Sequence, residues 1–461
     1  MINVEISSCI KLPNGNPIRE KIFADLTLPN PKYEKAQRFG HWPGDIPKEI
    51  NLYSVTDDSR MVLPRGYISK LVRRFKESGT EYQVVNKTLA LPPVEFGSRI
   101  KLRDYQAQAV DRLVRMKQGG VVAPCGSGKT IIMLEAVARI KQPTLWVCNS
   151  YELLEQTKER ACQVLDIKAD EIGQIAGGKV NVGKRLTISL VQTLSNADLD
   201  QITDKFGCII VDEAHHLPAN SFFHPIGQFP ARYRLWASAT PTRDDGLTEM
   251  IFAAGGPILH EVTRDQVPTL TPSLRVVETP FNSRYGADEY VQLIGHLVGD
   301  ESRNRYLVDV IAKEAPGSYS LVLSERKEHL NLLRGLIEKA IPGIRVEVLT
   351  SDIKKKDRVE LMNRVQNREV DILLATKIAR EGLDILHLNR LFLVCPKKAS
   401  GALEQEVGRI VRPCEGKETA IVFDFWDTRH PVLKSQFWKR RTVYESMGIK
   451  WDPKTNVRAG G

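Results

Sequence analysis

The chain has few of the features that mark secreted, membrane-spanning or zinc-binding proteins. Its 461 residues include only 7 cysteines, and no two of them form a C-x-x-C pair. No stretch approaches the roughly 18 apolar residues that a membrane-spanning helix needs. The N-terminus has no charged leader followed by an apolar run. We therefore expect a cytoplasmic protein with reduced thiols, no zinc site and no membrane partner.

The charge balance is also modest. The sequence has 66 Lys and Arg against 56 Asp and Glu, a net charge of +10. An excess of this size in a chain of this length is compatible with a polyanionic partner but does not by itself predict one. The length predicts two or three domains, each with its own core.

The most informative stretch is residues 123–130, which read APCGSGKT between an apolar strand pattern and an apolar helix pattern. Glycines let backbone N–H groups approach a phosphate, the lysine adds a positive charge, and the threonine hydroxyl suits Mg²⁺. Ala123 stands where the strict motif has Gly, so a glycine-rich turn before an ordinary helix remains the alternative. The expected phosphate loop comprises Gly126, Ser127, Gly128, Lys129 and Thr130.

A second apolar strand pattern, at 208–211, ends in Asp212 and Glu213. Ligands of open α/β sheets bind at the carboxyl ends of the strands. Asp212 would share Mg²⁺ with Thr130, and Glu213 would position the attacking water. Two carboxylates at a strand end are more often surface charge, but together with the upstream loop they favour an ATP-hydrolysing site.

Strand and helix patterns alternate in two stretches, which predicts two parallel sheets in tandem. Only the first stretch carries a phosphate loop, which suggests a cleft between two domains. Pro92-Pro93 and the change of pattern beyond it mark an earlier boundary. The predicted divisions are a small α+β N-terminal domain (1–97), a first α/β domain (98–257), a connector (258–300), a second α/β domain (301–430) and a basic, aromatic tail (431–461).

Six motifs in this order resemble those of the superfamily 2 helicases and translocases, in the DEAH-box-like branch. They are LRDYQ at 102–106, the phosphate loop, VDEAH at 211–215, SAT at 238–240, ATKIAREGLDI at 375–385 and QEVGRIVR at 405–412. The resemblance implies two tandem RecA-like domains and the cofactors ATP and Mg²⁺.

Further patterns resemble the XPB group and, more closely, the UvsW-type phage recombination helicases. These are LRDYQ, TPTR at 240–243 and RNRYL at 303–307. The N-terminal patterns NPKY at 30–33, RFGHWPG at 38–44 and LPRGYISKL at 63–71 resemble the DNA-binding domain of the UvsW type. Asn149 departs from the proline of many relatives, which puts details of strand contact in doubt.

The resemblance assigns roles to single residues. Lys129 would bind the β- and γ-phosphates, Gln106 would read adenine with Arg103 nearby, and Asp384 would meet the ribose. From the second domain, Gln405 would help to place the water, and two arginines would act as arginine fingers. Taken alone, that arginine pair would fit a solvated helix face. The implied catalytic residues are Lys129, Asp212, Glu213, Gln405, Arg409 and Arg412.

A further set would link the ATP site to nucleic acid. By the family pattern, the coupling residues are His215, Ser238 and Thr240, for which core and turn contacts are the alternative. Contacts to the phosphate backbone, which carry no sequence information, are expected at Asn149, Ser150, Gln192, Thr193 and Thr376.

The sequence thus predicts an ATP- and Mg²⁺-dependent DNA helicase or translocase, acting on duplex or branched DNA in recombination, repair or replication restart. A motor subunit of a restriction or defence complex is one alternative. A non-catalytic DNA-binding module with a relict site is another, and the intact Lys129, Asp212, Glu213 and Arg412 argue against it. The motifs leave RNA open as a substrate.

Overall fold

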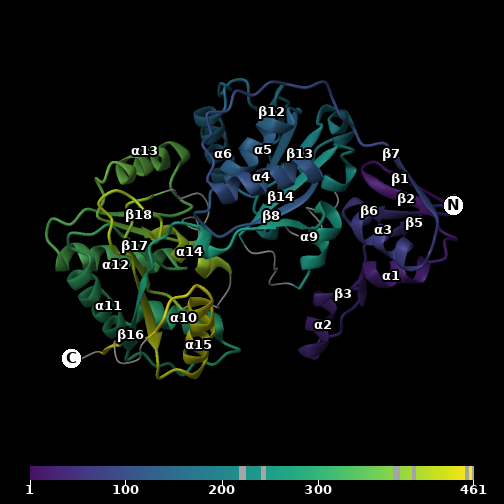
Figure 1. Cartoon of the computed structure of the whole chain (residues 1–461). Coiled ribbons are helices and arrows are strands. Elements are labelled where there is room, and N and C mark those ends of the chain that lie inside the picture. Colours follow the sequence, from purple (N-terminus) through teal and green to yellow (C-terminus); the bar gives the residue numbers. More distant parts are fainter. Residues whose placement is uncertain (217–224, 240–245, 377–384, 397–400, 452–455, 459–461) are drawn as a thin grey trace. The chain divides into compact units, whose positions relative to one another are not determined.

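A computed structural model describes residues 1–216, 225–239, 246–376, 385–396, 401–451 and 456–458 (Figure 1). The chain forms two compact units, Met1–Gln266 and Val267–Gly461. In the described residues no helix has the length and apolar character to cross a membrane.

The first unit begins with a five-stranded sheet in the order β5-β6-β2-β1-β7, where only the β1–β7 pair is parallel. Helix α3 is amphipathic and turns Leu71 and Phe75 into the core of this domain. The elements are β1 (Ile2–Ile6), β2 (Cys9–Pro13), α1 (Arg19–Leu26), β3 (Thr27–Pro29), α2 (Pro31–Arg38), β4 (Glu49–Asn51), β5 (Ser54–Val55), β6 (Arg60–Pro64), η1 (Arg65–Tyr67), α3 (Ile68–Glu77) and β7 (Tyr82–Asn86).

The same unit continues with an eight-stranded sheet in the order β11-β10-β12-β9-β13-β14-β8-β15, parallel except for β11. Its elements are α4 (Asp104–Met116), β8 (Gln118–Val122), α5 (Lys129–Ile140), β9 (Thr144–Cys148), α6 (Tyr151–Val164), β10 (Gly173–Ala176), β11 (Lys179–Asn181), β12 (Leu186–Leu190), α7 (Val191–Ser195), η2 (Leu199–Gln201), η3 (Thr203–Lys205), β13 (Cys208–Val211), η4 (Ala214–His216), β14 (Tyr233–Ser238), α9 (Thr248–Gly255), β15 (Ile258–Glu261) and η5 (Arg264–Gln266).

Helix α5 is buried almost all round, which fits its nearly unbroken apolar sequence. Gly120 in β8 has no room for a side chain, because a Cβ atom there would lie 2.0 Å from the Trp236 ring. These close contacts fix the strand and the helix that flank the phosphate loop. They therefore set the position of the loop itself.

The second unit is a seven-stranded, all-parallel sheet in the order β18-β19-β17-β20-β21-β16-β22. Its elements are β16 (Ser273–Thr279), α10 (Tyr290–Gly299), α11 (Glu301–Glu314), β17 (Ser320–Leu323), α12 (Lys327–Ala340), β18 (Val346–Leu349), α13 (Lys355–Gln366), β19 (Ile372–Ala375), β20 (Arg390–Leu393), α14 (Gly401–Ile410), β21 (Ile421–Asp427), α15 (Pro431–Ser446) and β22 (Val457–Arg458).

The predicted alternation of strands and helices is confirmed, and both α/β sheets are parallel as expected, apart from the edge strand β11. The stretch 258–300, expected as a connector, holds β15 of the first sheet, β16 of the second sheet and α10. The stretch expected as a tail holds α15, which packs on β21, and β22, which pairs with β16. Periodicity did not assign these strands to the two sheets, because their membership depends on pairing with segments far away in the sequence.

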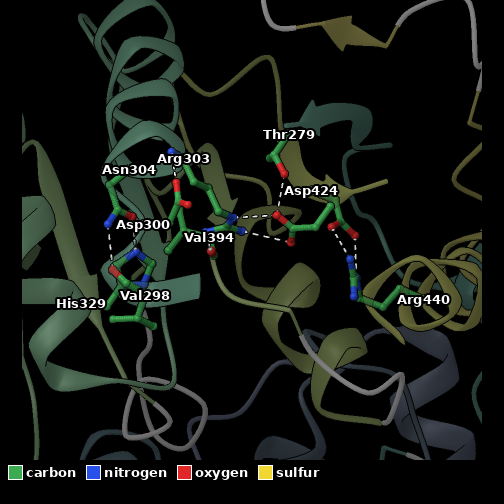
Figure 2. A network of polar contacts seen from close by, with 10 residues as sticks. Thr279, Val298, Asp300, Arg303, Asn304, His329, Val394, Asp424 and Arg440 are labelled. Carbon is green, nitrogen blue, oxygen red and sulfur yellow. Dashed lines mark hydrogen bonds and ion pairs between the residues drawn. The ribbon is translucent and has the colours of Figure 1, made fainter. Parts of the chain in front are cut away.

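A buried polar network crosses the second unit (Figure 2). Arg303 on α11 donates to the carboxylate of Asp427 at 2.7 and 3.3 Å and to Val394 O at 3.0 Å. Asp424 lies on β21, as Asp427 does, and accepts two hydrogen bonds from Arg440 at 2.8 and 2.7 Å. The ion pairs join α11, β21 and α15, and the bond to Val394 O ties α11 to the chain just after β20.

Candidate nucleotide and nucleic-acid sites

The phosphate loop joins the end of β8 to the first turn of α5. Gly126 and Gly128 adopt φ values of 86° and 82°, in the left-handed region that favours glycine. Gly128 is the N-cap of α5, so the unpaired N–H groups of the first helical turn begin here. The Ser127 hydroxyl is buried and has no hydrogen-bond partner among the described residues. The loop thus offers backbone and side-chain donors to an anion.

The start of α4 lies against this loop. Gln106 Nε2 and Tyr105 Oη both donate to Ser127 O, at 2.8 and 2.9 Å. A Cβ atom at Gly128 would meet Gln106 Nε2 at 2.6 Å. Gln106 also closes a capping box with the backbone N–H of Arg103. The structure therefore brings the predicted adenine-reading residues, Gln106 and Arg103, to the phosphate loop.

Asp212 and Glu213 follow β13, which is separated from β8 by β14. Glu213 has a φ of 47°, a sparsely populated conformation for a residue with a side chain. Its carboxylate lies 3.3 Å from Lys129 Nζ, which also donates to Ala123 O at 3.3 Å. Its backbone N–H donates to Asp212 Oδ1 at 3.0 Å. The strained turn thus holds both carboxylates beside the phosphate loop.

Burial shifts the titration of this cluster. It raises the pKa of Asp212 to about 7, and the neighbouring Glu213 carboxylate adds to that effect. Burial alone would lower the pKa of Lys129, but attraction to Glu213 outweighs it, so the pKa of Lys129 lies above its ordinary value. Lys129 therefore stays charged, beside two carboxylates.

This arrangement fits a nucleotide with Mg²⁺. Two carboxylates face one ammonium, the Ser127 hydroxyl lacks a partner, and the half-buried Thr130 occupies the first turn of α5. Among the described residues, no group of three or more His, Cys, Asp or Glu side chains could hold a metal ion. Mg²⁺ usually takes one or two protein carboxylates and completes its shell with phosphate oxygens and waters, which fits this site.

The predicted coupling residues lie next to Glu213. His215 Nδ1 is 2.7 Å from Ser238 Oγ and 3.4 Å from Glu213 Oε2. Ala239 N donates to the same Glu213 oxygen at 3.4 Å. This chain of contacts joins the end of β13 to the end of β14. Thr240, the third predicted coupling residue, lies outside the described residues.

Four of the predicted nucleic-acid contacts gather at the ends of β9 and β12, which are paired in parallel. Gln192 Nε2 donates to Asn149 O at 3.2 Å, and Thr193 follows on α7. The Ser150 hydroxyl caps α6 by accepting from Leu153 N at 3.3 Å. Asn149 Oδ1 is buried without a hydrogen-bond partner among the described residues.

The remaining predicted residues belong to the second unit. Thr376 is buried at the end of β19, and its N–H donates to Leu349 O at 3.3 Å. Gln405 and Arg409 are buried on α14, and Arg412 is half-buried just beyond the end of that helix. Asp384 lies outside the described residues.

One cation near the phosphate loop was not predicted. Val262 N donates to Val122 O at 2.8 Å, so the chain after β15 runs beside the start of the loop. There Arg264 is half-buried; burial lowers the pKa of Arg264, and the Cys125 thiol in the loop opposes that shift. No sequence motif marks this arginine, because its position depends on the pairing of β15 with β8.

Comparisons with known proteins bear on both units. The family model "Type III restriction enzyme, res subunit" matches residues 99–243, and the model "Helicase conserved C-terminal domain" matches residues 302–414. A putative ATP-dependent RNA helicase of Acanthamoeba polyphaga mimivirus is 29% identical over 371 residues, covering 75% of this chain and 67% of that protein.

A DNA 3'-5' translocase of the XPB type from Sulfurisphaera tokodaii is 26% identical over 388 residues, covering 75% of this chain and 86% of that protein. The crystal structure of T4 UvsW aligns over 99% of both chains, with 14% identity and a TM-score of 0.41. The two family models and the XPB relative agree with the motif order and with the two parallel sheets. The chain belongs to the superfamily 2 helicases, in the group that contains XPB, and is an ATP-dependent helicase.

Proposed function

We propose that this helicase couples ATP hydrolysis to movement on duplex or branched DNA, in recombination, repair or replication restart. The observation that carries the proposal is the contact of Lys129 with Glu213 at the phosphate loop, continued through His215 to Ser238. This path leads from the groups that would meet the γ-phosphate to the strand end that carries the coupling motif. The relative named as a DNA 3'-5' translocase supports DNA as the substrate.

Phosphoryl transfer needs positioning and charge neutralisation rather than covalent catalysis. Lys129 would bind phosphate oxygens with the N–H groups of Gly126, Ser127 and Gly128, and Gln106 and Arg103 would hold the base. Glu213 would orient the attacking water. Mg²⁺, held by Thr130 and Asp212, would neutralise charge on the phosphates.

The second unit would complete this site. Arg409 and Arg412 would act as arginine fingers, Gln405 would help to place the water, and Asp384 would meet the ribose. ATP would then favour the state in which these groups reach the nucleotide, and hydrolysis would release it. His215, Ser238 and Thr240 would carry this change toward the nucleic acid.

On the nucleic-acid side, Asn149, Ser150, Gln192, Thr193 and Thr376 would contact phosphate oxygens. The clustering of the first four at neighbouring strand ends supports this assignment. The N-terminal domain, expected over residues 1–97, would select duplex or branched substrates. DNA is favoured over RNA by the named translocase, although another relative is named as an RNA helicase.

A restriction or defence motor is the second candidate, because the first family model is named after a restriction subunit. Such a motor would act with a nuclease in a partner chain. Affinity purification of the tagged chain from its host, followed by mass spectrometry and a nuclease assay, would identify that partner.

The test of the proposed function is unwinding of four labelled substrates side by side: a fork, a Holliday junction, a plain duplex and an RNA duplex. The proposal expects ATP-dependent unwinding that is fastest on the fork or the junction. Unwinding confined to RNA would contradict it, and so would strand separation that does not need ATP. A chain with Lys129→Ala serves as the control for contaminating helicases.

A further inference from the structure

Two arginine side chains are buried together where the N-terminal domain packs against the first α/β domain. Arg65, on η1, is 2% exposed, and Arg234, on β14, is 1% exposed. The two domains share a core here, because Met250 and Ala253 of α9 pack among apolar residues of the N-terminal domain. A Cβ atom at Gly66 would lie 2.1 Å from Phe252 O. The contact is therefore too close to admit a side chain.

Every hydrogen-bond acceptor that the structure gives these two arginines is neutral. Arg65 donates to Gln118 Oε1 at 2.7 Å and to the carbonyl oxygens of Ala231, Arg232 and Ser7 at 2.5, 2.9 and 3.3 Å. Arg234 donates to the carbonyl oxygens of Phe229, Ser8 and Ala254 at 2.8, 3.1 and 3.2 Å. These bonds satisfy N–H groups and tie the domains together, but they do not neutralise the charges.

The positive charges of Arg65 and Arg234 are therefore not neutralised by their hydrogen-bond partners. Among the described residues, no carboxylate is a hydrogen-bond partner of either arginine. Burial, reinforced by the charge of Arg234, lowers the pKa of Arg65. Burial also lowers the pKa of Arg234 to about 10, and the Cys9 thiol opposes that shift. Like charges in a low dielectric are costly unless an anion accompanies them.

A cavity of about 240 Å³ opens onto both arginines. Its polar lining includes Cys9, Asn51 and Ser54 besides Arg65 and Arg234. Arg234 Nε is buried and has no hydrogen-bond partner in the described part of the chain. A water molecule takes up about 30 Å³ of liquid volume, so the cavity has room for a small oxyanion together with several waters.

We propose that this cavity is a binding site for a phosphate group, supplied either by a nucleic-acid backbone or by a free phosphate. Guanidinium groups present planar forks of donors that match phosphate oxygens. The site is separate from the ATP loop and lies between two domains, so its occupant would stabilise their contact. Binding of a phosphate group in the cavity would therefore strengthen the contact between the N-terminal domain and the first α/β domain.

Cys9 provides a direct probe, because it lines the cavity and is half-buried. The full-length protein is treated with iodoacetamide at increasing inorganic phosphate and constant ionic strength, and labelling is followed by peptide mass spectrometry. With phosphate at ten times its dissociation constant, labelling of Cys9 should slow about tenfold. Cys162, which is also half-buried but lies on α6, is the internal control and should not change.

Two kinds of variant sharpen this test. Lys129→Ala weakens the ATP loop and should leave the protection of Cys9 intact, which separates the two phosphate sites. Arg234→Gln should abolish the protection. Asn51→Asp keeps an acceptor for the Thr27 hydroxyl but adds a negative charge at the exposed rim, so it should weaken the protection even if Arg234→Gln does not fold.

The two sources are compared with a short single-stranded DNA in place of phosphate. Protection by DNA that Arg234→Gln or Asn51→Asp weakens assigns the site to a backbone phosphate. Protection by phosphate but not by DNA assigns it to a free anion. An unchanged rate of Cys9 labelling with both probes overturns the proposal and leaves the two arginines as a structural clamp.

Discussion

Buried charges are used in two different ways in the two units. In the second unit, Arg303 and Arg440 are fully buried and each faces a buried carboxylate, with both oxygens of Asp427 and Asp424 engaged (Figure 2). In the first unit, Arg65 and Arg234 meet only neutral acceptors. Around Lys129, in the same unit, negative charge is in excess, because the carboxylates of Asp212 and Glu213 lie beside one ammonium group.

The difference separates structure from ligand binding. A matched pair of charges joins elements and needs nothing else, whereas an unmatched group keeps a cost that a ligand can remove. The excess of negative charge near Lys129 suits a divalent cation with a nucleotide, and the excess of positive charge at Arg234 suits an anion. Substitutions in the two kinds of cluster should therefore affect different measurements.

The largest effect is expected at Lys129. Lys129→Ala should reduce ATP turnover by at least about 10³, the scale of charge stabilisation in phosphoryl transfer. The free energy of unfolding should change little, because Asp212 can take up a proton in place of the lost cation. Steady-state ATPase assays and urea unfolding measure the two quantities. Lys141→Ala, at an exposed lysine paired with Glu95, is the control. Near-normal turnover would refute the assigned site.

Arg303 should show the reverse pattern. Arg303→Met should lower the free energy of unfolding by about 3–5 kcal/mol, because it strands the buried Asp427 carboxylate. Turnover per folded molecule should persist at temperatures where the variant stays folded. Adding Asp427→Leu should recover part of the loss, which a double-mutant cycle would reveal. Arg305→Ala, at an exposed pair on the same helix, is the matched control. Strictly additive losses would show that the pair is not coupled.

His329 should make the second unit sensitive to acid. Burial, with the charge of Arg303 adding to it, lowers the pKa of His329 to about 3. The imidazole lies 2.9 Å from Asn304 Oδ1, and Asn304 is oriented by its bond to Val298 O. In the unfolded chain this histidine titrates near 6.5. Between these values only the unfolded state binds the proton, so stability falls as the pH drops below about 6.5.

The free energy of unfolding should fall by up to about 1.4 kcal/mol for each pH unit below the unfolded pKa of His329. The free energy of unfolding, measured with urea from pH 7 to pH 4, should therefore fall more steeply with decreasing pH for the wild type than for His329→Gln. The glutamine keeps hydrogen-bonding groups but does not titrate. Parallel pH profiles for the two proteins would contradict the assignment.

The smallest effect is expected at Ser127. Ser127→Ala removes a buried hydroxyl that has no partner among the described residues, so stability should stay the same or rise slightly. If the hydroxyl serves the nucleotide, affinity for ATP should fall about fivefold, equivalent to one hydrogen bond. Nucleotide titration and thermal unfolding give both values. Ser446→Ala, at an exposed serine on α15, is the control. Unchanged affinity would remove Ser127 from the site.

The sequence predicted those parts of the site that lie close to strand ends. Local patterns marked β8 and β13, and the carboxyl ends of parallel strands share one edge, so Lys129 and Glu213 could be expected together. The family resemblance implied an adenine-reading role for Gln106, whereas its hydrogen bond to Ser127 O was found only in the structure. The left-handed backbone of Glu213 carried no signal, because no glycine or asparagine marks it.

Contacts between distant segments could not be predicted. Arg65 and Arg234 are 169 positions apart, and both are buried by the docking of one domain on another. The same holds for Arg264, which β15 brings to the phosphate loop. Strand β16 and the edge strand β22 belong to the second sheet only through long-range pairing. Periodicity describes single elements and says nothing of these partners.

The central claim is that this helicase is a motor whose ATP turnover depends on nucleic acid. Its most direct test is steady-state ATP hydrolysis by the full-length chain, with and without forked DNA, at fixed Mg²⁺ and salt. The account predicts a strong stimulation by the fork that disappears with Lys129→Ala. An ATP hydrolysis rate that neither DNA nor RNA changes would contradict it. A stimulation that survives Lys129→Ala would contradict it as well.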